Sequence, residues 1–81
     1  MSVTSTEHTS IRVDCYAGYR GEQEPRKFFL GQESITVVEV IDRWISPGHR
    51  YFKCRGSDGD IYILRQDVAK DRWEITLYMK A

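Results

Sequence analysis

Hydrophobic and polar residues alternate with a period of two over much of the chain from Ile11 onward. Such alternation predicts half-buried β-strands, because successive side chains of a strand point to opposite faces. In the last of these runs, Trp73, Ile75, Leu77 and Met79 fall on one side. Together with short apolar runs, the pattern predicts strands at residues 11–17, 27–31, 35–45, 50–56, 61–66 and 73–80.

Turn-forming residues separate the predicted strands. A Pro-Gly pair at 46–49 and an Asp-Gly pair at 57–60 are typical of tight hairpins. The segment 18–26 reads as a long loop, and 67–71 fits one short helical turn with Asp67 as its N-cap. Since no amphipathic helix is present, the pattern predicts an all-β fold.

The expected architecture is a small, strongly bent antiparallel sheet of five to six strands closing into an SH3-like barrel. The run 35–45 is rich in β-branched residues and is longer than a small barrel is tall. We therefore expect this strand to bend or bulge and to serve both halves of the sheet. Residues 1–10, mostly Ser and Thr, read as a disordered tail before a single domain at 11–81.

Composition narrows the class of protein further. Twelve basic and twelve acidic residues give zero net charge. This balance argues against a dedicated nucleic-acid or membrane binder and makes self-association more plausible. The two cysteines, Cys15 and Cys54, lie outside any CxxC spacing. Free thiols, the lack of a signal peptide and the lack of a membrane-spanning apolar run predict a cytoplasmic protein without membrane contact.

The register of the Pro-Gly hairpin decides which residues are exposed. If Ser46 lies opposite His49, Trp44 faces Tyr51, and an even turn at 57–60 places Tyr62 opposite Arg55. The inward set is then Ile41, Phe52, Cys54, Ile61 and Ile63. A one-residue bulge would reverse the faces and bury Trp44, and a strand that changes face part-way is a third possibility.

Two groups of residues are candidate binding sites. In the even register the first forms an aromatic and basic hairpin face, which suits stacking on bases and contacts with phosphates. The alternative is a structural role, in which these side chains pack across the strands and stabilise the sheet. The second group lies in the loop after the first strand, in a segment that contacts peptides in SH3-like barrels, and it could equally be a solvated connection. The first comprises Trp44, Tyr51, Lys53, Arg55 and Tyr62, and the second Tyr19 and Arg20.

No residue pattern indicates catalysis, a metal or a cofactor. The two histidines lack the spacing of a zinc site, and "SDGD" lacks the ligand series of a calcium loop. His49 lies in a turn without an evident nucleophile or orienting partner, and both cysteines fall on inward faces. We therefore expect no enzyme activity and infer no small-molecule ligand.

The pieces "PRKFFLG", "VEVIDRW", "PGHRYFKC" and "DGDIYILRQD" resemble a small bacterial domain family of unknown function. The resemblance covers residues 26–73. It implies a compact bacterial β domain and carries over no catalytic or binding residue.

These observations predict a non-enzymatic binding module. Its expected partner is another protein or a second copy of the chain, because aromatic and Arg side chains are enriched at protein interfaces. The alternative is single-stranded nucleic-acid binding through the hairpin face.

Overall fold

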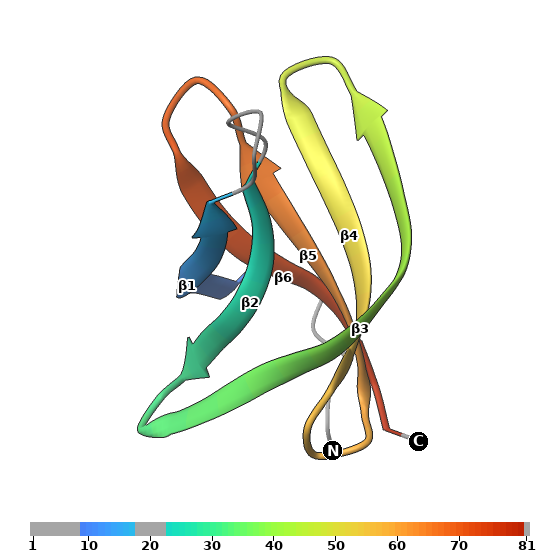
Figure 1. The fold of residues 1–81 in the computed structure, drawn as a ribbon. Coiled ribbons are helices and arrows are strands. Elements are labelled where there is room, and N and C mark those ends of the chain that lie inside the picture. The colour runs from blue at the N-terminus through green and yellow to red at the C-terminus, as the bar shows by residue number, and fades with distance from the viewer. Residues whose placement is uncertain (1–8, 18–22, 81) are drawn as a thin grey trace, which may run out of the picture.

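The computed structural model describes residues 9–17 and 23–80 and forms a closed antiparallel barrel. Each strand pairs with its neighbour in the chain, and β1 returns to pair with β6 (Figure 1). The all-β prediction is confirmed, and the size is consistent with an SH3-like barrel. The strands are β1 (Thr9–Ala17), β2 (Gln23–Leu30), β3 (Glu33–Ser46), β4 (His49–Gly56), β5 (Ile61–Asp67) and β6 (Arg72–Met79).

Strand β3 joins the two halves of the barrel, as expected from its length. In Figure 1 it runs from its start beside β2, across the molecule, to its end beside β4. Its first residues pair with β2 as far as Thr36, and from Val37 onward it pairs with β4. Two register shifts, between Val37 and Glu39 and between Val40 and Asp42, give it the bend.

Asp67 ends β5 and residues 68–71 form a turn; since the described residues contain no helix, the helical turn predicted at 67–71 is wrong. Asp67 Oδ1 does accept a hydrogen bond from Lys70 N at 3.1 Å, as an N-cap would. However, Asp71 has a φ of 52°, in the left-handed region, which turns the chain into β6 and prevents a helix from continuing. Val68 N donates to Gly48 O at 3.1 Å, which joins the tips of the two neighbouring hairpins.

The loop predicted at 18–26 is too long, because β2 already begins at Gln23. Pro25 pairs with Cys15 beside a register shift of the β1–β2 ladder, which leaves Arg26 as the extra residue of β2. An irregular position of this kind tolerates a proline, which has no N–H to donate to the ladder. Strand β1 begins at Thr9, and residues 1–8 lie outside the described part of the chain.

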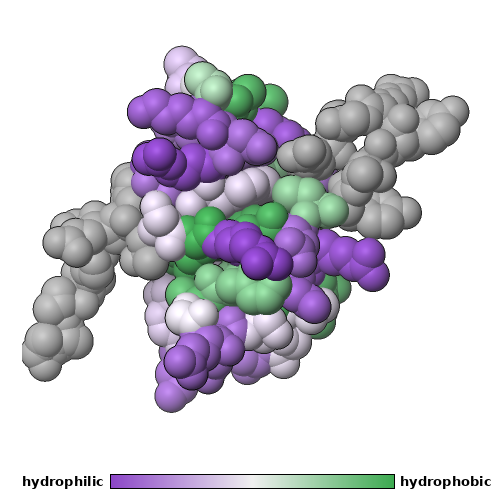
Figure 2. All heavy atoms as spheres, turned by 90° about the vertical axis from the view of Figure 1, so that its left-hand side faces the viewer, coloured by the Kyte–Doolittle hydropathy of each residue, from purple (hydrophilic) through white to green (hydrophobic). Residues whose placement is uncertain are grey.

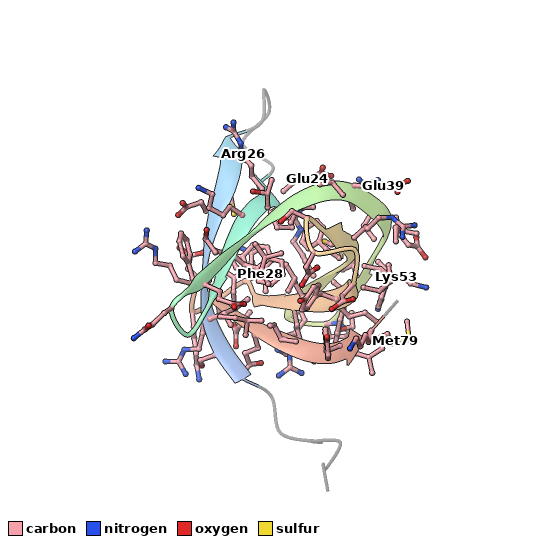
Figure 3. All side chains as sticks on the ribbon, turned by 90° about the horizontal axis from the view of Figure 1, so that it is seen from below. Glu24, Arg26, Phe28, Glu39, Lys53 and Met79 are labelled. Carbon is pink, nitrogen blue, oxygen red and sulfur yellow. The ribbon has the colours of Figure 1, made fainter. Side chains whose placement is uncertain are left out.

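The core lies along the barrel axis and draws on five of the six strands. Phe28 projects into the centre of the barrel (Figure 3) and is fully buried. The other buried hydrophobic side chains are Ile35, Phe52, Cys54, Tyr62, Leu64, Trp73 and Ile75. Strand β1 packs Ile11, Val13 and Cys15 against this core.

The first hairpin has the predicted even register at its tip. Ser46 pairs with His49 across Pro47-Gly48, and Trp44 pairs with Tyr51. Beyond Asp42 the register shifts at Ile41, and Val40 then pairs with Cys54. The strand therefore changes face part-way, and Ile41 is exposed instead of lying in the core.

The second hairpin differs by one residue from the expected register. Gly59 has a φ of 88°, its N–H donates to Gly56 O, and Gly56 N donates to Asp60 O. These bonds define a three-residue loop with a left-handed glycine, whereas the prediction assumed a two-residue turn. As a result Cys54 pairs with Tyr62, while Ile61 and Ile63 leave the predicted core set.

A further register shift, in the β5–β6 ladder, reverses the end of β6. Ile63 pairs with Leu77 and Leu64 pairs with Ile75, so Thr76 is the extra residue. Trp73 and Ile75 face inward as predicted, but Leu77 and Met79 are each 41% exposed. The strand thus moves two apolar side chains from the predicted inner side to the outside of the barrel.

Candidate binding surface

The outward side chains of β3–β6 form one continuous surface, which we call the outer face. Strand pairing places them in three cross-strand rows. Glu39, Lys53 and Met79 project from the barrel on the same side in Figure 3, which looks along the molecule from below. The rows are Trp44–Tyr51–Arg65–Glu74, Asp42–Lys53–Ile63–Leu77 and Glu39–Arg55–Ile61–Met79.

An aromatic stack begins the first row. The rings of Trp44 and Tyr51 lie 5.3 Å apart between centroids and are tilted by only 5°. Arg65 extends the row and donates from Nε to Glu74 Oε1 at 3.1 Å. Hydrogen bonding to Glu74 raises the pKa of Arg65; burial opposes this rise, and a hydrogen bond with Tyr51 adds to it. The stack is therefore held in place from the β5 side by a charged pair.

The two basic residues predicted for the site lie on the outer face beside carboxylates. Arg55 Nε is 3.4 Å from Glu39 Oε1, and both side chains are about half exposed. Lys53 lies directly opposite Asp42 in the ladder. Each cation therefore has an acidic neighbour on β3, and the outer face carries no patch of uncompensated positive charge at this point.

Two apolar pairs complete the outer face, and the sequence prediction missed them. Ile61 pairs with Met79, and Ile63 pairs with Leu77. The alternation in "IYILRQ" fits either face of a strand, so it could not identify the isoleucines as outward. The only local signal for their orientation was the Asp-Gly loop, because its odd number of residues sets which side chains of β5 point outward.

Tyr62 does not belong to this surface, contrary to the prediction. It is 2% exposed, and its ring packs edge-on against Phe28 at 4.8 Å. Its hydroxyl donates to Asp58 Oδ2 at 2.5 Å. Burial, and then this hydrogen bond, raise the pKa of Tyr62 above that of a free tyrosine. The slip in the second hairpin places Tyr62 in the core, where it anchors the turn.

The second predicted group, Tyr19 and Arg20, lies outside the described residues.

Possible catalytic groups are dispersed. His49 Nε2 lies 3.9 Å from Asp67 Oδ2, which is beyond hydrogen-bond length. Both cysteines are free; burial raises the pKa of Cys15, and it raises the pKa of Cys54 to about 12. Within the described part of the chain, no three His, Cys, Asp or Glu side chains are grouped so that they could hold a metal ion.

The face around β1 has a different character. Strand β1 leaves β6 after the pair Ile11–Trp73, and a cavity of about 720 Å³ opens between β1 and residues 70–73, where the turn leads into β6. Figure 2 shows hydrophobic side chains in a band across the middle of this side, between hydrophilic ones above and below. The lining of the cavity combines basic Arg12 and Lys70 with acidic Asp14, so the cavity offers no single dominant charge.

The fold and the outer face define a small closed β-barrel with a mixed aromatic, charged and apolar surface. Comparison of the chain with protein-family models, with curated proteins and with solved structures finds no match in any of the three. The resemblance to a bacterial family therefore stays a prediction. In the described residues, no helix is long and apolar enough to cross a membrane.

Proposed function

We propose that this chain is a non-enzymatic module that binds a protein through the outer face. The observation that carries the proposal is the pairing of Ile61 with Met79 and of Ile63 with Leu77 on the outside of the barrel. Exposed apolar side chains grouped beside aromatic and charged ones mark interaction surfaces more often than scattered ones do. Trp44 and Tyr51 add the side-chain types that dominate binding energy at such surfaces.

Charge on the outer face favours a protein partner over a nucleic acid. Phosphate binding depends on cations whose counterions are released when the polymer binds. Here Arg55 lies beside Glu39 and Lys53 lies opposite Asp42, so each cation already has an anion close by. A protein surface with charges of both signs complements this arrangement better than a polyanion does.

The proposed setting is cytoplasmic, which two unpaired thiols in the described residues support. The partner is either a different protein or a second copy of the chain. The sequence has zero net charge, so there is little electrostatic repulsion between molecules, and this favours association of either kind.

A pair of matched variants tests the proposal. Leu77→Glu places a charge among the outward apolar pairs, while Val68→Glu places the same charge on a 56% exposed side chain of the β5–β6 turn, away from the outer face. Sedimentation across a concentration series reports self-association, and pull-down with quantitative mass spectrometry reports other partners. We expect Leu77→Glu to abolish the association and Val68→Glu to retain it. Equal behaviour of both variants and the wild type would remove the basis of the proposal.

The nucleic-acid alternative is tested separately with labelled oligo-dT and oligo-U at low ionic strength. We expect no change in anisotropy with either polymer. Salt-sensitive binding that is lost in the Lys53→Ala, Arg55→Ala double variant would replace the protein-binding proposal with the nucleic-acid one.

A further inference from the structure

A second concave site lies at the open end of the barrel. The last ladder pair between β2 and β3 is Lys27–Thr36, and towards Glu24 the two strands no longer pair. A cavity of about 380 Å³ opens where the inner side of the β3–β4 hairpin faces β2. We call it the mouth cavity. Its lining residues are Glu24, Arg43, Trp44, Ile45, Arg50 and Phe52.

Arg50 is the polar centre of the mouth cavity. It is inward on β4, and its guanidinium carbon lies 5.0 Å from the ring centroid of Phe52, which is itself 1% exposed. Arg50 Nη1 donates a hydrogen bond to Gln66 Oε1 at 3.3 Å. Gln66 is only 6% exposed, and its Nε2 donates in turn to Asp71 Oδ1 at 3.3 Å. The buried amide therefore fixes the position of the guanidinium.

The guanidinium keeps most of its hydrogen-bonding capacity for a ligand. Arginine carries five N–H donors, and among the described residues only the bond to Gln66 uses one of them. No carboxylate of the described chain lies within ion-pair distance of Arg50, whereas Arg43 Nε is 2.9 Å from Glu24 Oε2. Since those two charges compensate each other, the lining has one positive charge in excess.

The remaining lining is apolar. Phe52 forms part of the floor, and Ile45, on the same side of β3 as Arg43, is 79% exposed. An isoleucine this exposed gains free energy if a ligand covers it. A volume of 380 Å³ holds about a dozen non-hydrogen atoms, since a water-sized group takes up ~30 Å³.

From these contacts we infer that the mouth cavity binds a small apolar monocarboxylate. Its carboxylate accepts hydrogen bonds from the planar guanidinium of Arg50, and its hydrocarbon part packs on Phe52 and Ile45. The single excess charge selects a monoanion over a phosphate dianion. The planar fork of arginine matches the two oxygens of a carboxylate. This site lies on the inner side of the hairpin and shares only Trp44 with the outer face, and its binding does not depend on the proposed function.

The test uses 4-phenylbutyrate as the probe and its amide, 4-phenylbutanamide, as a neutral ligand of the same shape. Binding is followed by calorimetry and by NMR shifts of the Arg50 Nε–H and the Phe52 ring. We expect the acid to bind and the amide to bind about ten-fold more weakly or worse. Equal affinity for acid and amide, or no binding of the acid, would overturn the inference without affecting the outer face.

Two variants locate the site. Arg50→Met keeps an apolar stem over Phe52 and removes the guanidinium, while Arg55→Met makes the same change on the outer face. We expect about a ten-fold or greater loss of affinity for the acid only in Arg50→Met. Ile45→Glu, at an exposed position that does not threaten folding, is expected to abolish binding by repulsion. Wild-type affinity in Arg50→Met or Ile45→Glu, or equal loss in Arg55→Met, would contradict the assignment.

Discussion

Replacing Tyr62 by Phe tests the register of the second hairpin, because this substitution keeps the ring and removes only the hydroxyl. The ring contacts with Phe28, at 4.8 Å, and with Tyr78, at 5.1 Å, are retained. The hydrogen bond to Asp58 is lost, and with it one link between β5 and the turn that precedes it. If Tyr62 lay on the surface, the same substitution would change almost nothing.

The expected loss follows from the type of bond. A hydrogen bond to a charged group contributes ~1.5–3 kcal/mol. Asp58 is exposed, so its carboxylate regains water in the variant and leaves no buried charge unsatisfied. The lower end of the range therefore applies, about 1.5 kcal/mol. With a urea m-value near the low end of ~1–3 kcal/mol/M, the midpoint of unfolding should fall by about 1–1.5 M.

Urea unfolding followed by tryptophan fluorescence measures this shift. Tyr78→Phe is the matched control, because its hydroxyl also donates to a carboxylate, Asp60, at 2.6 Å, but from a side chain that is 51% exposed. We expect a clearly smaller shift for the control. A midpoint for Tyr62→Phe that equals the wild-type value, or a larger effect of Tyr78→Phe, would refute the placement of Tyr62 in the core.

The same tyrosine gives the stability a pH dependence. Burial and the bond to Asp58 raise the pKa of Tyr62 in the folded state, so the folded protein holds this proton more tightly than the unfolded chain. That contribution is complete below the unfolded pKa of about 10 and is lost as pH rises above it. The stability difference between wild type and Tyr62→Phe should therefore shrink in alkaline solution, as urea unfolding at several pH values would show.

Further predictions concern the thiols and one glycine. Because burial raises the pKa of Cys54 to about 12, iodoacetamide near neutral pH should alkylate Cys15 first and Cys54 only on unfolding; equal rates by peptide mass spectrometry would contradict this. Gly56→Ala places a Cβ 2.7 Å from Ile35 Cγ2 and should destabilise the barrel by about 1–3 kcal/mol in thermal unfolding. An unfolding midpoint for Gly56→Ala that equals the wild-type value would be inconsistent with the packing described.

The sequence predicted the elements of the fold better than their registers. At the Pro-Gly turn the sequence left three arrangements open; the structure has the even register at the tip, where Trp44 pairs with Tyr51, and a change of face further along β3. The Asp-Gly turn has two solutions, and the longer one forms here with Gly56 beside Ile35 and Tyr62. That contact joins residues far apart in the chain, and no local pattern encodes it.

Which residues make up the candidate site also depends on strand registers that the sequence did not determine. In the even register Lys53 and Arg55 were expected on the outside, and they are there. The pairing of Lys53 with Asp42 belongs to that register, but the pairing of Arg55 with Glu39 required knowledge of the shift at Ile41. Each bulge reverses every later side chain of its strand. Because of one-residue shifts at the Asp-Gly turn and at Thr76, Tyr62 lies in the core and not on the outer face. The pairs Ile61–Met79 and Ile63–Leu77 lie on the outer face in its place.

Site-specific photo-crosslinking in the native cell tests the central claim most directly. A benzophenone amino acid replaces Leu77 on the outer face in one variant and Val68 on the β5–β6 turn in the other; the two side chains have comparable exposure. On irradiation, the account predicts a discrete protein adduct, either with one partner or with a second copy of the chain, at position 77 and none at position 68. An adduct at 68 alone, an adduct with nucleic acid at 77, or no adduct at 77 would contradict it.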